Sequence, residues 1–277
     1  MNAGKSTIHW TPEQIQRFWD WHAEKPNNQN EYFSSLLGRG IVAFLEKTGK
    51  LKGNVLDYGC GPGFLCGRLL GAGVQCYGAD SSEDSIRKAN SQFAHKPNWK
   101  GGFLVDNFKS PFPDDFFDVV TCIETIEHLP EEAMIPLLKE LKRLIKPNGI
   151  VMITTPFNEK FEEALVYCPV CESTYHKWQH MQTFTIQSLQ SLLSSCCYEV
   201  LFCQNTDLRQ FQRTFPLKPL QDLSFRRITD WMAFRKRRIL DDFFPRPFPH
   251  GYDTQFRLGT GSGRHLCAVA TKTEIVG

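Results

Sequence analysis

Two kinds of hydrophobic pattern alternate along the chain. Short apolar runs bounded by glycine, proline or polar residues predict buried strands, and apolar residues that recur every three or four positions predict amphipathic helices. This alternation is typical of an α/β fold with a doubly wound, mostly parallel sheet and helices on both faces. The expected strands are 54–58, 74–80, 102–106, 117–123, 149–155, 198–205 and 265–272, and the expected helices are 63–71, 82–93, 131–145 and 185–195.

The first 50 residues precede this alternation and predict a helical N-terminal cap. Thr11-Pro12-Glu13 is a typical helix start, because threonine caps the first turn, proline fits it and the acid faces the positive end of the helix. A second helix is expected over 32–48, with its apolar residues roughly on one face. Two interpretations stay open: the helices pack against the edge of the sheet, or they cap a ligand cleft.

A glycine-rich turn joins the first expected strand to its helix. The stretch Asn54-Val-Leu-Asp-Tyr-Gly-Cys-Gly-Pro-Gly63 contains three glycines at alternate positions. Such a strand–turn–helix unit opens a doubly wound fold, and ligands bind outside the carboxyl ends of its strands. Glycine allows the tight turn and the close approach of a ligand to the backbone. A dinucleotide fingerprint would need glycine where Phe64 stands, so NAD binding is disfavoured.

Acidic residues follow the next two expected strands. Asp80, followed by Ser81, ends the second strand, where a carboxylate can accept both hydroxyls of an adenosine ribose. Asp106 and Asn107 follow the third strand, where Asp106 can accept from an adenine amino group. An aspartate at a strand end is often only a turn or capping residue. The order and spacing of all these features together indicate a nucleoside site.

The glycine loop, the ribose carboxylate and the sequence Lys146-Pro-Asn-Gly149 after a helix resemble the class I S-adenosylmethionine-dependent methyltransferases. The resemblance covers residues 50–206 and 265–273. It implies a Rossmann-like methyltransferase domain over 51–277, preceded by the cap over 1–50, with S-adenosyl-L-methionine as cofactor.

The same resemblance implies the roles of the cofactor-binding residues. Asp57 and the loop from Gly59 to Gly63 would hold the methionine part, Asp80 the ribose, and Asp106 with Asn107 the adenine. The full implied set is Asp57, Gly59, Cys60, Gly61, Gly63, Asp80, Ser81, Asp106, Asn107 and Ile123.

Candidate catalytic residues follow the fourth expected strand, where a methyl acceptor should lie. Glu124, Glu127 and His128 offer two carboxylates and an imidazole within five residues. Methyl transfer is an in-line displacement whose leaving group is already activated, so positioning supplies much of the catalysis. An oxygen acceptor must also lose its proton to a general base or a metal. The alternative is that Glu127 and His128 only cap the next helix.

The E-x-x-E-H string resembles two methyltransferase groups. One is the ubiquinone-biosynthesis type of O-methyltransferase, which acts on small phenolic molecules. The other 2′-O-methylates the 3′ end of small RNAs. In that family the two glutamates, the histidine and a distant second histidine bind a divalent metal that engages the terminal ribose hydroxyls. By this resemblance Glu124, Glu127 and His128 match, and His176 or His180 would be the fourth ligand.

A cysteine- and histidine-rich loop over 157–184 follows the fifth expected strand. Its core, Cys168-x2-Cys171-x4-His176-x3-His180, places four soft or borderline ligands within 13 residues, which suits a tetrahedral zinc site. The set also resembles a group of bacterial-type small-molecule methyltransferases with CPxC followed by an aromatic, histidine-containing stretch. We predict zinc at Cys168, Cys171, His176 and His180; the alternative is a loop with reduced cysteines and solvated histidines.

Composition narrows the class of protein. At 277 residues with 41% apolar content, the chain suits one α/β domain with an insertion. We see neither a run of ~20 apolar residues nor the apolar core of a signal peptide, so we expect a cytoplasmic protein whose ten cysteines are reduced. A net charge of +2 argues against a general polyanion binder.

The charge is uneven, because the insertion over 207–264 holds 12 Lys/Arg against 6 Asp/Glu, together with ten aromatics. A packed subdomain, an oligomer contact, a substrate wall and a surface for RNA or anionic lipid stay open for it.

We therefore predict a methyltransferase that acts on oxygen of a small-molecule acceptor, with His128 as a general base titrating near ~6.5. The nearest alternative is RNA 2′-O-methylation with a divalent metal, which lacks a recognisable RNA-binding module here. An alternative of another class is a non-catalytic, cofactor-binding regulatory protein.

Overall fold

The computed structural model describes residues 10–24, 32–211 and 263–273. Nine strands fall into a seven-stranded sheet and a separate two-stranded hairpin, among these residues. The sheet order is β3-β2-β1-β4-β5-β9-β8, and β9 runs antiparallel to both of its neighbours. The strands are β1 (Asn54–Tyr58), β2 (Gln75–Asp80), β3 (Trp99–Leu104), β4 (Phe117–Ile123), β5 (Ile145–Pro156), β6 (Leu165–Tyr167), β7 (Thr174–His176), β8 (Tyr198–Thr206) and β9 (His265–Lys272).

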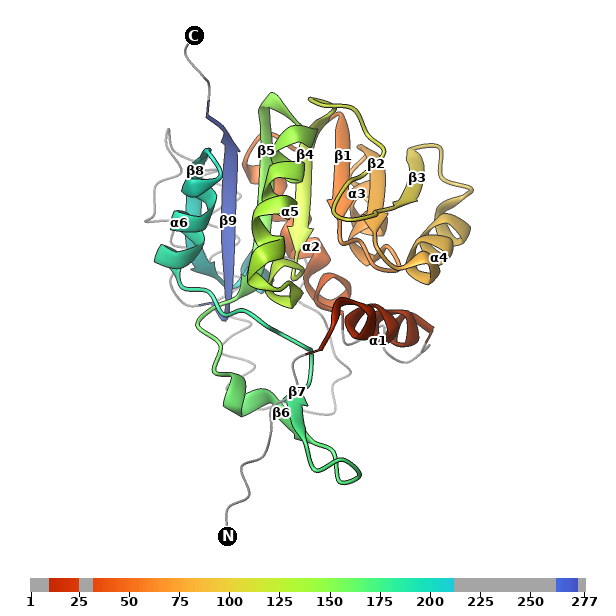
Figure 1. The fold of residues 1–277 in the computed structure, drawn as a ribbon. Helices are drawn as coiled ribbons and strands as arrows, with labels where there is room; N and C mark the ends of the chain where they lie inside the picture. The colour runs from red at the N-terminus through yellow and green to blue at the C-terminus, as the bar shows by residue number, and fades with distance from the viewer. Residues whose placement is uncertain (1–9, 25–31, 212–262, 274–277) are drawn as a thin grey trace, which may run out of the picture.

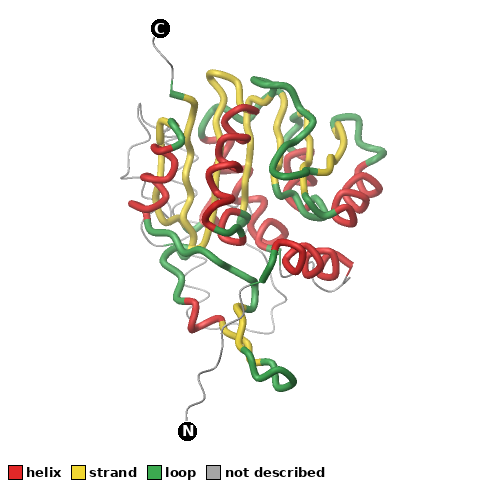
Figure 2. Tube along the Cα trace, in the orientation of Figure 1, coloured by secondary structure: helices red, strands yellow, loops and turns green. Residues whose placement is uncertain are grey.

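Helices cover both faces of the large sheet. In Figure 1, α5 and α6 lie in front of it and α2 and α3 behind it. Figure 2 shows how the loops gather at the lower end, where the arrows of β1 and β4 point. The helices are α1 (Pro12–Glu24), α2 (Phe33–Lys47), α3 (Phe64–Gly71), α4 (Glu83–Phe93), α5 (Glu131–Leu144) and α6 (Ile186–Ser195), with short 3-10 turns η2 (Ile126–His128), η3 (Phe161–Ala164) and η4 (Leu208–Phe211).

The core consists of two apolar layers, one on each face of the sheet. Alternate residues of β4 and β5 serve the two layers, so Val120 and Val151 join the α5 side while Val119 and Met152 join the other side. Strands β4 and β5 are buried on both faces, which is why they read as continuous apolar runs rather than alternating ones.

The expected element order is confirmed, with three differences. The fifth strand was expected to begin at 149, yet β5 begins at Ile145, and its pairing with β4 shifts between Ile145 and Ile150. Gly149 is needed in this bulge, because a Cβ there would lie 2.9 Å from the Phe117 carbonyl oxygen. Strand β3 begins at Trp99 rather than 102, and the β6–β7 hairpin inside the predicted Cys/His loop was missed.

The N-terminal helices play two different parts. Helix α2 buries Ile41, Phe44 and Leu45 in the core, as packing against the sheet requires. Helix α1 crosses below the carboxyl ends of the strands, beside α4 (Figure 1). The insertion predicted over 207–264 lies mostly outside the described residues, as does the first part of the predicted cap.

Candidate functional site

A large cavity opens at the carboxyl ends of the parallel strands. Its volume is about 1470 Å³, and its walls come from the glycine loop, the loops after β2, β3, β4 and β5, and helix α1. This position lies beside the switch point between β1 and β4, where ligands bind in doubly wound folds. The lining includes Gly61 and Asp80 beside β1 and β2, and His128 and His180 from the segments that follow β4 and β7.

The glycine loop turns sharply between β1 and α3. Gly59, Gly61 and Gly63 all have positive φ, of 77°, 50° and 89°. A Cβ at Gly59 would lie 2.4 Å from the Thr125 hydroxyl, so a larger residue would push against the loop that follows β4. Gly59 and Gly61, with Cys60 between them, line the cavity, which leaves backbone exposed to a ligand there.

Asp80 lies where the sequence placed it, at the end of β2 and on the cavity wall with Ser81. Its two carboxylate oxygens accept backbone N–H bonds from Gly61 and Ser82, both at 2.8 Å. These bonds tie the second strand to the glycine loop. Burial raises the pKa of Asp80, against the effect of these two hydrogen bonds.

Asp57 occupies a different place from the other predicted cofactor residues. Its carboxylate is buried beneath the loop, where it accepts from the Thr121 hydroxyl at 2.8 Å and lies 3.7 Å from the Cys66 thiol. It is absent from the cavity lining. Burial raises the pKa of Asp57 to about 7. The structure therefore gives Asp57 contacts that join β1 to β4 and to α3, next to the glycine loop.

The turn after β3 faces the cavity through Asn107 and Phe108, both with positive φ. The Tyr58 hydroxyl donates to the Phe108 carbonyl at 2.7 Å, which fastens this turn to β1. Asp106 pairs with Lys109 across the turn and does not line the cavity. Of the predicted adenine-side pair, Asn107 is the member on the wall, and Ile123 lines the wall at the end of β4.

Helix α1 forms one wall of the cavity, so the cap interpretation holds for this helix. Trp19 and His22 line the cavity, and the Trp19 ring lies edge-on to His128 with 4.9 Å between centroids. The Ser82 hydroxyl donates to Asp20 at 2.6 Å, and Lys88 bonds to the Ala23 carbonyl. These two contacts fasten α1 to α4 and its N-cap.

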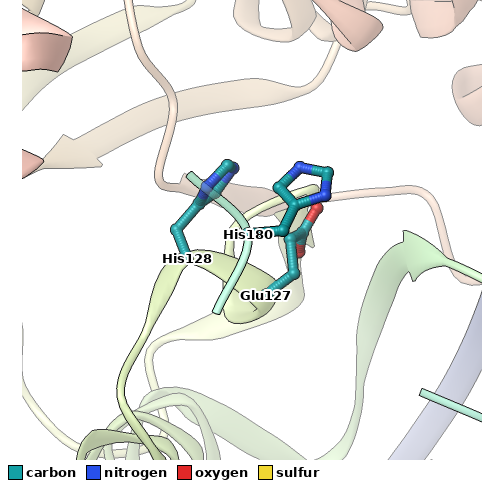
Figure 3. Close-up of side chains that lie close together, drawn as sticks. All are labelled: Glu127, His128 and His180. Atoms are coloured by element: carbon teal, nitrogen blue, oxygen red, sulfur yellow. The ribbon is translucent and has the colours of Figure 1, made fainter. Parts of the chain in front are cut away.

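At the far end of the cavity, Glu127, His128 and His180 converge (Figure 3). One ligand atom from each of the three lies within 4.8 Å of the others. Glu127 and His128 come from η2, directly after β4, and His180 comes from the loop after β7. The Glu127 carbonyl accepts from the backbone N–H groups of Met181 and Gln182, at 2.7 and 3.1 Å, and this brings the distant histidine to the site.

Several polar atoms of this cluster and of the neighbouring Glu124 are buried without a hydrogen-bond partner. Both carboxylate oxygens of Glu127 are buried without a hydrogen bond, as is Nδ1 of His128. Glu124 has φ of 47°, an uncommon value for a side chain of this kind. Its Oε2 lies 2.9 Å from Nδ1 of His265 on β9, and its Oε1 is buried without a partner.

Burial changes the protonation of the two central groups in opposite directions. It raises the pKa of Glu127 well above its usual range, with Glu124 adding to the rise. It lowers the pKa of His128 to about 3, with His180 adding to the fall. This lowered pKa does not fit the expected rise in rate through a His128 pKa near ~6.5, and that pH profile stays a prediction.

A second group shares His180 with the first. Glu159, on the loop after β5, lies 2.5 Å through Oε2 from Nδ1 of His180 and 3.4 Å through Oε1 from Nε2 of His176. The two histidine rings stack with 4.5 Å between centroids. These contacts lower the pKa of Glu159 to about 2, although burial alone would raise it.

The structure does not bring the predicted zinc ligands together. The β6–β7 register pairs Leu165 with His176, so Cys168 and Cys171 lie toward the tip of the hairpin and His176 at its base. Neither cysteine belongs to a metal-binding group of three or more side chains, within the described residues. The Ser173 backbone, and then the Cys168 thiol, lower the pKa of the exposed Cys171. A zinc centre with all four ligands stays a prediction.

Comparison with known proteins decides the family. A family model described as a methyltransferase domain matches residues 14–201, from helix α1 into β8. The chain belongs to the class I S-adenosylmethionine-dependent methyltransferase family. The match confirms the predicted family, and it includes the wall formed by α1.

Curated relatives of this methyltransferase carry a more specific name. It is 32% identical over 157 residues to a "Ubiquinone biosynthesis O-methyltransferase" of Thiobacillus denitrificans, covering 56% of this chain and 64% of that protein. It is 34% identical over 162 residues to a protein of the same name from Bordetella pertussis, covering 56% and 62%. The match therefore spans less than two thirds of the length of either relative.

Solved structures agree with the fold. A methyltransferase from Archaeoglobus fulgidus described as SAM-dependent is similar with a TM-score of 0.54 at 17% identity, over 88% of this chain and 97% of that one. A DhpI–SAH complex is similar with a TM-score of 0.56 at 14% identity, over 94% and 97%. At these identities the likeness concerns the fold, which is the predicted Rossmann-like one.

Sequence reasoning missed three residues of the site: Trp19, Glu159 and His265. Trp19 and His265 lie far along the chain from Glu124–His128, and only the sheet order and the place of α1 bring them near. Glu159 had an available signal, because it lies inside the predicted Cys/His loop and carries a carboxylate.

Proposed function

We propose that this methyltransferase transfers the methyl group of S-adenosylmethionine to a hydroxyl oxygen of a small-molecule acceptor, with a divalent cation at the acceptor end. The observation that carries the proposal is the buried Glu127 carboxylate, which has no hydrogen-bond partner and lies beside His128 and His180 on the same cavity. A buried ionised carboxylate without a partner is strongly destabilised, so such a group is either protonated or paired with a cation.

The cofactor end of the cavity fits S-adenosylmethionine. Gly59 and Gly61 leave backbone open to a ligand, and Asp80 offers a carboxylate whose position is fixed by two backbone N–H bonds. Asn107, on the turn after β3, would face the base. The buried Asp57 would act indirectly, by supporting the loop that holds the methionine part.

The acceptor end fits a divalent cation. Glu127, His128 and His180 supply one carboxylate and two imidazole ligands, and Glu124, which lines the same cavity, also has a buried oxygen without a partner. When bound, such a cation would lower the pKa of an acceptor hydroxyl and orient it. The neutral His128 can offer a nitrogen lone pair, because burial prevents its protonation near neutral pH.

The cavity is large enough to hold cofactor and acceptor together. Its 1470 Å³ exceeds the ~300–1000 Å³ of a usual single-ligand site. Trp19, Phe33 and Trp178 supply aromatic walls near the Glu/His cluster, and such walls suit a flat, apolar ring that carries the hydroxyl. The name of the curated relatives, which is an O-methyltransferase name, supports oxygen as the atom that accepts the methyl group.

A second candidate function, 2′-O-methylation of an RNA 3′ end, is favoured by one observation. The family that performs this reaction uses two glutamates, a histidine and a distant second histidine. The position of His180 beside Glu127 and His128 supplies a candidate for that second histidine. We prefer the small-molecule acceptor, because the aromatic walls lie at the same end of the cavity.

The test is a methyl-transfer assay on metal-stripped protein with labelled S-adenosylmethionine. 3,4-Dihydroxybenzoate serves as the hydroxyl probe, and a short single-stranded RNA with a free 3′ end as the competitor. We expect transfer to the phenol after Mn²⁺ is added, little transfer with chelator, and a loss of about 10²–10⁴-fold in Glu127→Gln. The control Glu131→Gln changes an exposed carboxylate on α5 and should keep the rate.

Three results would contradict the proposal in different ways. Full activity in the presence of chelator would show that the reaction needs no divalent cation. Methylation of the RNA but not of the phenol would favour the second candidate. Cofactor binding without transfer to either probe, with Mn²⁺ present, would favour the non-catalytic alternative.

A further inference from the structure

Glu159 lies between two histidines whose ring nitrogens can be assigned from their surroundings. Nδ1 of His176 lies 3.0 Å from the backbone nitrogen of His180 and 3.3 Å from that of Trp178, and both of these N–H groups donate to it. A nitrogen that accepts two N–H bonds carries no proton. The proton of neutral His176 is therefore on Nε2, which faces Oε1 of Glu159 at 3.4 Å.

The same reasoning assigns His180. Its Nδ1 lies 2.5 Å from Oε2 of Glu159, and a carboxylate oxygen accepts the proton of a ring N–H. In the neutral form of His180 the proton is therefore on Nδ1. Its Nε2 keeps the lone pair, which is the form of imidazole that binds a metal.

Glu159 could in principle be a metal ligand itself, since Glu159, His176 and His180 lie close enough to form a group. The distances argue against this. Nδ1 of His180 lies within hydrogen-bond distance of Oε2 of Glu159, so a cation that bound both atoms would have to displace the proton between them. A ligating histidine that donates its other N–H to a carboxylate is the common arrangement around protein metals.

We propose that Glu159 is a positioning residue that holds His180 in the Nδ1–H form and so leaves Nε2 as the ligand atom for a divalent cation beside Glu127 and His128. This inference rests on the proposed function for the cation. Nε2 of His176 lies 3.4 Å from the other oxygen of Glu159, so the carboxylate lies between the two histidine rings.

The backbone around Glu159 is fixed in the same way. The Thr183 hydroxyl donates to the Glu159 carbonyl at 3.1 Å, and the neighbouring Asn158 N–H donates to the Phe184 carbonyl at 2.8 Å. Both contacts join the loop after β5 to the segment that follows His180. The carboxylate and the histidine it orients therefore lie on two segments that are bonded to each other.

The experiment combines nitrogen NMR with cation binding on the full-length, metal-free protein. In ¹⁵N-histidine-labelled protein, we expect His180 to show a protonated Nδ1 and an unprotonated Nε2. Mn²⁺ affinity is measured by the loss of the free-ion electron paramagnetic resonance signal. Glu159→Gln keeps the shape and removes the charge, and we expect it to weaken Mn²⁺ binding by about 10–100-fold. S-adenosylhomocysteine affinity should not change.

The matched control is Glu162→Gln, which removes an exposed carboxylate from η3 close by in the chain and should leave the Mn²⁺ affinity unchanged. Protonation of Nε2 in wild-type His180 would overturn the inference without any variant. If Glu127→Gln loses Mn²⁺ affinity but Glu159→Gln keeps it, the role of Glu159 is contradicted while the proposed cation site stands. A wild-type protein that binds no Mn²⁺ would overturn the proposed function as well.

Discussion

At the scale of single residues, the site is built from charged groups that are buried before any ligand arrives. Glu127 has both carboxylate oxygens buried without a partner, and Glu124 has one. Leaving such a group unsatisfied costs about 1–3 kcal/mol or more. This cost is typical of a functional site, because a cation or a substrate can remove it and bind more tightly as a result.

The burial of Glu127 predicts how the stability of metal-free protein depends on pH. A raised folded-state pKa means that the contribution of Glu127 is fully present below its unfolded pKa of ~4.3 and is lost as pH rises through the folded value. Between pH 5 and pH 8, the free energy of unfolding of wild type should fall relative to that of Glu127→Gln, by on the order of 1–3 kcal/mol. Urea unfolding with chelator present measures this difference.

The control for that experiment is Glu131→Gln. Because the Glu131 carboxylate is exposed, its removal should leave the pH dependence of stability as in wild type. Added Mn²⁺ should stabilise wild type at pH 8 through mass action and have little effect on Glu127→Gln. Equal slopes against pH for wild type and Glu127→Gln would show that Glu127 keeps an ordinary pKa.

At the scale of elements, α1 decides how the acceptor end is closed. It belongs to the region matched by the family model, and its Trp19 lies against His128. The contacts from Ser82 to Asp20 and from Lys88 to Ala23 join it to the cofactor end. One helix therefore touches both halves of the cavity.

We expect Trp19→Ala to raise the KM for the acceptor about tenfold, equivalent to ~1.4 kcal/mol, because it removes an aromatic wall beside the Glu/His cluster. The affinity for S-adenosylhomocysteine, measured by calorimetry, should change less. Arg17→Ala, an exposed position on the same helix, is the control. Equal losses of acceptor and cofactor affinity would mean that Trp19 only holds the helix in place.

The elements that the sequence predicted well are those whose signal is local. Strand β9 was predicted with the bounds that it has, since a buried apolar run ends at polar residues on both sides. The β6–β7 hairpin was missed because each strand has only three residues, too few to show a period. The bulge at 146–149 contains a proline and a glycine, as many turns do. Only its pairing with β4 distinguishes it from a turn.

At the scale of the whole molecule, the sheet order places the two halves of the site. Strands β1 and β2 carry the cofactor end, and β4 and β5 carry the acceptor end, on either side of one switch point. None of the described helices is long and apolar enough to cross a membrane. The predicted cytoplasmic location stays a prediction.

The candidate site was predictable only in part, because some of its residues are brought together by the sheet order and not by the local sequence. Asp80, Glu124 and His128 follow strands directly, so the fold class alone puts them on one edge. The partners Glu159 and His265 depend on where loops return and on the antiparallel register of β9, which no local pattern contains. The zinc prediction for Cys168 and Cys171 used their spacing and a resemblance to CPxC-containing methyltransferases, and neither shows the hairpin register that places His176 at the other end of the hairpin.

The most direct test of the account is a crystal structure of the protein grown with S-adenosylhomocysteine and Mn²⁺, with anomalous scattering from manganese measured. We predict one manganese peak between Glu127, His128 and His180, and the cofactor product along the glycine loop with its ribose at Asp80. Manganese at Glu159 and His176, or cofactor product bound with no peak beside Glu127, would contradict a cation-assisted methyltransferase.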